Sequence, residues 1–125
     1  MTEDMVEDGF YPRHDFERPH LSDAPVCWPV LSAEERPDFV ADLKDWVRWL
    51  VDRYGLDQRT VTPCWTMHEE LIEELSALRT AWIACYTFPL DGSAPLAWHA
   101  SFAEARVRLS EWISRNGCRP GEHRG

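Results

Sequence analysis

The chain has 125 residues, which is the size of a single domain. It carries 22 acidic against 13 basic residues and a net charge of −9, a balance that argues against a broad phosphate-binding surface. No apolar run approaches the roughly 18 residues of a membrane span, and the acidic N-terminus lacks a signal-peptide pattern, so a cytoplasmic location is expected. The six glycines are not grouped, which excludes a glycine-rich phosphate loop.

Residues 1–24 are expected to form a disordered acidic tail. They hold seven acidic side chains and two arginines, include two prolines, and show neither helical nor strand periodicity. Phe10, Tyr11 and Phe16 stand out, because aromatic residues in such a tail either dock on a partner or fold back on the domain. The sequence leaves both alternatives open. Residues 119–125 are also expected to be disordered.

Residues 25–118 are predicted to form the folded domain, a small all-α three-helix bundle. Its first part is a Pro-rich strip that Pro25 and Pro29 keep extended. Trp28 and Leu31 are expected to anchor this strip against the helices.

The first helix is predicted at about 37–54. Pro37 suits a first helical position, and Gly55 suits the left-handed residue that closes a helix. Trp49 lies at the border of the apolar face. That face has the helical 3-4 spacing and consists of Phe39, Val40, Leu43, Trp46, Val47, Leu50, Val51 and Tyr54.

The second helix is predicted at about 67–86, opened by a capping box of Thr66 and Glu69. Four glutamates crowd its first two turns, where the helix dipole favours them. The third helix is predicted at about 95–116, with Gly117 as its stop and His99 and Arg106 beside its apolar face. The two apolar faces comprise Leu71, Ile72, Leu75, Leu78, Trp82 and Tyr86, and then Trp98, Phe102, Leu109, Trp112 and Ile113.

Three blocks of sequence within about 28–118 carry a resemblance to a known family. They are Trp46-Val47-x-x-Leu50-x-x-Arg53-Tyr54-x-Leu56, then Pro63-Cys64-Trp65-x-x-His68-x-x-Leu71-x-Glu73-Glu74-Leu75-Ser76-Ala77-Leu78, and Trp98-His99 through Arg108-Leu109-x-Glu111-Trp112 to Gly117-Cys118. The chain resembles the domain of unknown function 4913 family, small actinobacterial proteins of plasmids, integrative elements and phages. The resemblance implies one folded unit and a mobile-element context, and it supplies no activity. The family pattern does not require Cys27.

A zinc site is one interpretation of the cysteines and histidines. Structural zinc needs four such ligands, usually with two of them in a tight pair. Here the spacing is loose and the ligands come from distant segments, so the favoured interpretation is no metal, with both histidines at the edge of the core near Trp65 and Trp98. The candidate ligands are Cys27, Cys64, His68 and His99.

A catalytic Cys64–His68 pair is the enzymatic alternative. Cys64 comes just before a helix, which is a favourable place for a thiolate. However, no oxyanion-hole glycines lie nearby, and the four glutamates oppose a thiolate. The segment from His68 starts like a zinc-protease helix, but Ile72 stands where the second His must be. The sequence therefore predicts no catalytic residue, no cofactor and no enzyme.

Arg79 and Arg106 lie beside apolar faces, where arginines often stack on aromatic rings or pair with an acid. Stacking is the first interpretation, and contact to an anion of a partner is the second. A nucleic-acid surface on the third helix is an alternative, although the link before that helix is too long for a helix-turn-helix. Its candidate residues are Arg106, Arg108, Arg115 and Arg119 with Trp112.

The leading hypothesis is a non-enzymatic protein-interaction module of a mobile genetic element, which binds another protein of that element. The chain has seven Trp, five Phe and three Tyr, more than three short helices are expected to hide, and exposed Trp and Tyr are typical of binding hot spots. Nucleic-acid binding is the second hypothesis and a zinc-stabilised domain the third. The candidate interaction residues are Trp28, Trp49, Trp65, His68, Arg79, His99 and Arg106.

Overall fold

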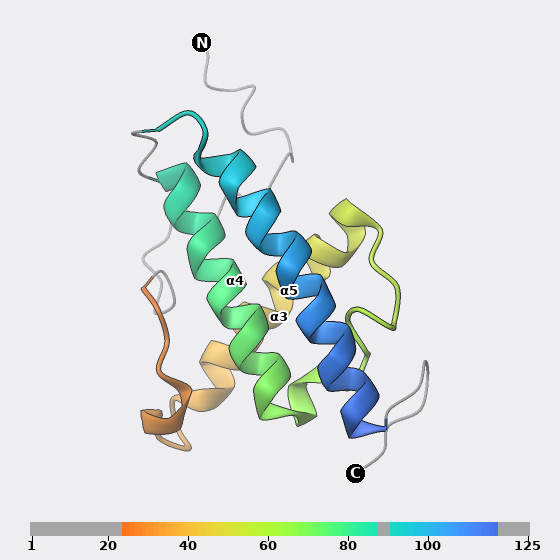
Figure 1. The fold of residues 1–125 in the computed structure, drawn as a ribbon. Coiled ribbons are helices and arrows are strands. Elements are labelled where there is room, and N and C mark those ends of the chain that lie inside the picture. The colour runs from red at the N-terminus through yellow and green to blue at the C-terminus, as the bar shows by residue number, and fades with distance from the viewer. Residues whose placement is uncertain (1–23, 88–90, 118–125) are drawn as a thin grey trace.

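The computed structural model describes residues 24–87 and 91–117, and within these ranges it contains three α-helices and no strand. They are α3 (Arg36–Tyr54), α4 (Glu69–Thr87) and α5 (Ala94–Asn116). Helices α4 and α5 run antiparallel beside each other, and α3 crosses behind them (Figure 1). The predicted all-α three-helix bundle is confirmed.

Both predicted tails fall almost entirely outside the described residues. The same holds for several residues singled out in the sequence, namely Phe10, Tyr11, Phe16, Cys118 and Arg119. Of the helices in the described part of the chain, none combines the length and the apolar character that a membrane span requires.

The segment before α3 differs in part from the predicted extended strip. Cys27 and Leu31 have extended backbones, but Trp28–Val30 forms a 3-10 turn between them. The turn places Trp28 in the core, where its ring meets Phe39 edge to face at 6.2 Å between centroids. The extended conformation is therefore wrong over three residues, whereas Trp28 and Leu31 do anchor the segment.

A capping box precedes α3, where none was predicted. The Ser32 hydroxyl accepts a hydrogen bond from Glu35 N (3.0 Å), and the Glu35 carboxylate accepts one from Ser32 N (2.9 Å). The helix closes at Gly55, whose φ of 63° is the left-handed conformation predicted for it. The capping box predicted at Thr66 is wrong, because a 3-10 turn takes up Trp65–Met67 and delays the start of α4.

We expect Ser32→Ala to lower the free energy of unfolding by about 1 kcal/mol, because it removes the acceptor for the Glu35 amide. Urea denaturation followed by circular dichroism measures this change. Ser101→Ala is the matched control, since Ser101 is exposed within α5 and Ala is the better helix former. Equal losses in the two variants would contradict a capping role for Ser32.

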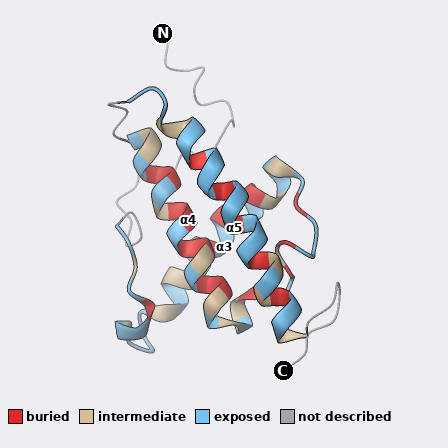
Figure 2. Ribbon diagram, viewed as in Figure 1, coloured by how far each residue is buried: buried red, intermediate tan, exposed pale blue. Residues whose placement is uncertain are grey.

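Aromatic rings from all three helices form one continuous cluster in the core. Trp46 and Trp49 of α3 lie with ring centroids 6.0 and 4.8 Å from Trp82 of α4. At the end of α3, Tyr54 lies 5.0 Å from Phe102 of α5. Figure 2 shows the buried residues along the facing sides of the helices. Many of the aromatic side chains of the chain are thus packed inside the bundle.

Candidate functional site

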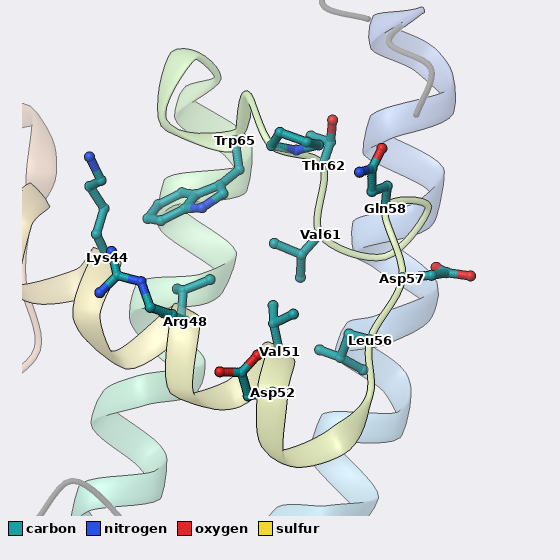
Figure 3. Close-up of a pocket in the computed structure, with 12 residues that line it drawn as sticks. Lys44, Arg48, Val51, Asp52, Leu56, Asp57, Gln58, Val61, Thr62 and Trp65 are labelled. Atoms are coloured by element: carbon teal, nitrogen blue, oxygen red, sulfur yellow. The ribbon is translucent and has the colours of Figure 1, made fainter. Parts of the chain in front are cut away.

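A groove of about 500 Å³ lies between α3 and residues 55–65, the segment that leads from α3 towards α4 (Figure 3). Figure 3 shows Val51, Leu56 and Val61 pointing toward its centre. The volume falls within the roughly 300–1,000 Å³ of ligand-binding sites. The apolar lining residues are Val47, Val51, Leu56, Val61, Pro63 and Trp65.

Local backbone chemistry shapes the outer wall of the groove. The left-handed Gly55 turns the chain out of α3, and Leu56 N donates a hydrogen bond back to Val51 O (3.1 Å). A turn follows in which Thr60 N donates to Asp57 O (3.1 Å). This returning segment is held to α5 by the Ser110 hydroxyl, which donates to the backbone carbonyl of residue 59 (3.1 Å).

The rim of the groove carries charged side chains of both signs. Lys44, the only lysine of the chain, and Arg48 lie one helical turn apart on α3. Arg48 also lies 3.3 Å from Asp45, an exposed pair of the kind that contributes little to stability. Asp52 lies on the same helix as these cations, and Asp57 lies on the other wall, where its carboxylate points away from the groove and accepts a hydrogen bond from Arg59 N (3.0 Å; Figure 3). The α3 edge of the groove therefore carries two cations and one carboxylate and is mainly basic.

The tryptophans expected to form an exposed binding surface are placed differently. Trp28 is 2% exposed and Trp65 is 7% exposed, so an exposed role for either is wrong. Trp49 is half-buried at the border of its helix face, as predicted, and packs on Trp82. The burial of Trp28 agrees with its expected anchoring role, and Trp65 is buried by the segment before α4. The exposed large apolar side chains of the described residues are Val30, Met67, Leu96 and Val107.

His99 is exposed on α5 at the end of the aromatic cluster. Its Nε2 lies 3.4 Å from the Tyr54 hydroxyl, and its ring lies 5.7 Å from that of Trp98. Burial raises the pKa of Tyr54, so the hydroxyl stays protonated at neutral pH and can donate to the imidazole. These contacts agree with the interpretation of His99 as a polar group at the edge of the core.

The four candidate zinc ligands do not come together. Cys64 and His68 are neighbours, with Sγ and Nε2 3.7 Å apart. Cys27 is exposed on the segment before α3, and His99 contacts Tyr54 instead. The described residues contain no group of three or more His, Cys, Asp or Glu side chains that could hold a metal ion.

Arg79 is 2% exposed, so a role in contacting a partner is wrong for this residue. Its Nη2 lies 3.8 Å from a carboxylate oxygen of Asp42, which makes an ion pair between α4 and α3 inside the domain. The apolar spacing of α4 predicts that Arg79 lies close to the buried face. The Asp42 carboxylate on α3 explains why a charged side chain is tolerated there.

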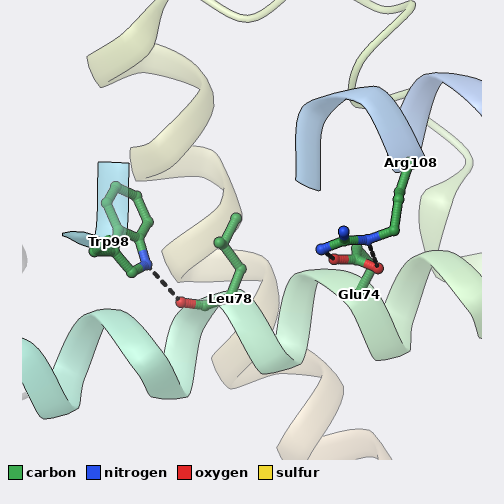
Figure 4. A network of polar contacts seen from close by, with 4 residues as sticks. All are labelled: Glu74, Leu78, Trp98 and Arg108. Carbon is green, nitrogen blue, oxygen red and sulfur yellow. Dashed lines mark hydrogen bonds and ion pairs between the residues drawn. The ribbon is translucent and has the colours of Figure 1, made fainter. Parts of the chain in front are cut away.

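The arginines of α5 that were candidates for phosphate contacts are engaged within the chain. Arg108 donates two hydrogen bonds to the Glu74 carboxylate, at 3.0 and 2.8 Å (Figure 4). Arg106 lies 5.5 Å from the centroid of Phe102, which agrees with the stacking interpretation, and Arg115 lies 5.0 Å from that of Trp112. Nearby, Trp98 Nε1 donates to Leu78 O (3.1 Å; Figure 4). The contacts of Arg108 and Trp98 hold α5 on α4, whereas those of Arg106 and Arg115 lie within α5.

A scan against protein-family models and searches of the curated proteins and of the solved structures found no match. Function is therefore inferred from the groove and from the side chains around it.

Proposed function

We propose that the chain is a non-enzymatic protein-interaction module, and that the groove between α3 and residues 55–65 binds a short segment of another protein. The observation that carries this proposal is the apolar floor beside the mainly basic edge formed by α3. Apolar contact supplies affinity in such a site, while a few polar groups set orientation and specificity.

The rim charges define the chemistry of the segment that fits. An apolar side chain of the partner reaches Val51 and Val61, and an acidic side chain beside it meets Lys44 and Arg48. The chain has a net charge of −9, one Lys and twelve Arg. Lys44 and Arg48 therefore form a locally basic site on an acidic protein.

The origin of the partner is a separate part of the proposal. The blocks of sequence that resemble the actinobacterial family support a partner encoded by the same mobile genetic element. Proteins whose genes lie beside this one are the first candidates to supply the bound segment.

Selection from a library of random peptides displayed on phage tests the proposal with the full chain as bait. We expect enriched peptides to carry an apolar residue next to Asp or Glu, and to bind less to Val61→Glu, which puts a charge on the groove floor. Leu96→Glu is the matched control, because Leu96 is exposed on α5 and does not line the groove. Binding measured by fluorescence polarisation should be unchanged in this control.

A charge reversal tests the orientation of the segment. The double variant with Lys44→Glu and Arg48→Glu should reject the acidic peptides and select basic ones instead, since both changes invert one edge of the rim. If selection enriches no peptide, or if binding survives both Val61→Glu and the charge reversal, the groove is not a peptide-binding site and the proposal fails.

A further inference from the structure

Cys64, His68 and Thr62 form a polar cluster just before α4. Cys64 Sγ lies 3.7 Å from His68 Nε2 and 3.6 Å from the Thr62 hydroxyl, both within hydrogen-bonding distance for sulfur. Thr62 is buried and Cys64 is half-buried against the core. The thiol is thus held between an imidazole and a hydroxyl, each of which can donate to a thiolate.

The local backbone keeps the cluster in place. The 3-10 turn Trp65–Met67 separates the cysteine from the histidine, with Met67 N donating to Cys64 O (2.9 Å) and His68 N to Trp65 O (3.1 Å). The next helix starts directly on His68, whose carbonyl accepts from the amides of Leu71 and Ile72, each at 3.1 Å. Both reactive side chains therefore stand on ordered backbone.

The charges around this cluster oppose a thiolate less than the sequence suggests. Of the four glutamates in the first two turns of α4, Glu69 pairs with Arg36 of α3 at 2.6 Å and Glu74 pairs with Arg108 of α5 at 2.8 Å. Glu70 and Glu73 are the other two. Two of the four negative charges are thus offset by cations from the neighbouring helices.

We infer that Cys64 is a thiol modification site, which exchanges with low-molecular-weight disulfides and uses His68 as its proton partner. A thiol becomes a nucleophile when a nearby base or cation favours the thiolate. The other two described cysteines lack this setting: Cys27 is exposed on the segment before α3, and Cys85 donates to Trp82 O (3.3 Å) while burial raises its pKa. This inference is independent of peptide binding in the groove.

The exchange step is balanced by the disulfide itself, which is the oxidant. The proton of the Cys64 thiol moves to His68 Nε2, and the thiolate attacks one sulfur of the incoming disulfide. A new S–S bond forms on Cys64 as the old one breaks. The leaving thiolate then takes the proton from the imidazolium, so the products are a mixed disulfide on Cys64 and one free thiol.

The reaction of the full chain with 2-hydroxyethyl disulfide, followed peptide by peptide with mass spectrometry, tests the inference. At about pH 6.5, where an ordinary thiol with a pKa near 8.5 is mostly protonated, we expect Cys64 to react about 10-fold faster than the exposed Cys27. The rate at Cys64 should also rise less steeply with pH than the rate at Cys27. Equal rates, or a slower reaction at Cys64, would overturn the inference without any variant.

His68→Gln is the decisive variant, and His99→Gln is its control because that exposed imidazole contacts Tyr54 instead. We expect the rate at Cys64 to fall about 10-fold in His68→Gln, since the thiolate loses its proton partner. It should stay unchanged in His99→Gln, and the rate at Cys27 should stay unchanged in both. An unchanged rate at Cys64 in His68→Gln would also overturn the inference.

Discussion

Replacing Trp46 with Ala is expected to lower the free energy of unfolding by about 3–5 kcal/mol. Trp46 has no exposed surface, and the centroid of its ring lies 6.1 Å from that of Trp49 and 6.0 Å from that of Trp82. Truncation leaves a large cavity where α3 meets α4, which the surrounding helices can fill only in part. Because small domains are stable by only about 5–15 kcal/mol, the loss is a large share of the total.

Chemical denaturation followed by far-UV circular dichroism measures this loss, and Trp46→Phe is the matched control. Trp46 Nε1 has no hydrogen-bond acceptor among the described residues, so Phe removes ring volume without breaking a hydrogen bond. Trp46→Phe should therefore cost about 1–2 kcal/mol. Similar losses for Ala and Phe would show that the ring is not the centre of the core that its burial indicates.

The second large effect concerns the ion pair between Asp42 and Arg79. Asp42→Ala should lower the free energy of unfolding by about 3 kcal/mol, because it removes the carboxylate that lies 3.8 Å from a buried guanidinium. The double variant with Asp42→Leu and Arg79→Met should cost less than about 1 kcal/mol or increase stability, because both charges of the pair are replaced by apolar chains of similar size.

The contrast between these two variants is what tests the pair, and denaturant midpoints of both measure it under the same conditions. Both variants break the same contact, but only Asp42→Ala leaves a buried charge behind. If the double variant costs as much as Asp42→Ala, the two side chains stabilise the fold mainly by contacts other than this ion pair.

The helices were predictable because the signals for them are local. The apolar spacing along α3 identified Leu43, Trp46 and Leu50, all of which are buried. Gly55 and Gly117 marked the ends of α3 and α5, and both have positive φ. Such signals involve only a few neighbouring residues, so they can be recognised in a single sequence.

The errors arose where a residue's environment depends on a distant segment. The burial of Trp28 and Trp65 depends on 3-10 turns that fold the linkers onto the helices. The capping box was assigned to the wrong helix because Ser32 and Thr66 are both followed three residues later by Glu. The acid that pairs with Arg79 could not be identified, because Asp42 lies on another helix.

The groove itself was not predicted from the sequence. Its floor combines side chains from α3, such as Val51, with side chains from the returning segment, such as Val61. In the sequence, each set alone looks like part of an ordinary apolar helix or loop face. The turn at Gly55, the hydrogen bond from Ser110 and the burial of Leu56 bring the two sets to opposite sides of one hollow.

Because of the hydrogen bond from Ser110, a ligand bound in the groove would also affect the stability of the whole bundle. Residues 55–65 face the groove on one side and are fastened to α5 on the other. A molecule bridging the two walls would therefore clamp the first and last helices together, although it touches only one of them. Such a molecule binds the folded chain and not the unfolded one, so the melting temperature would rise with its concentration.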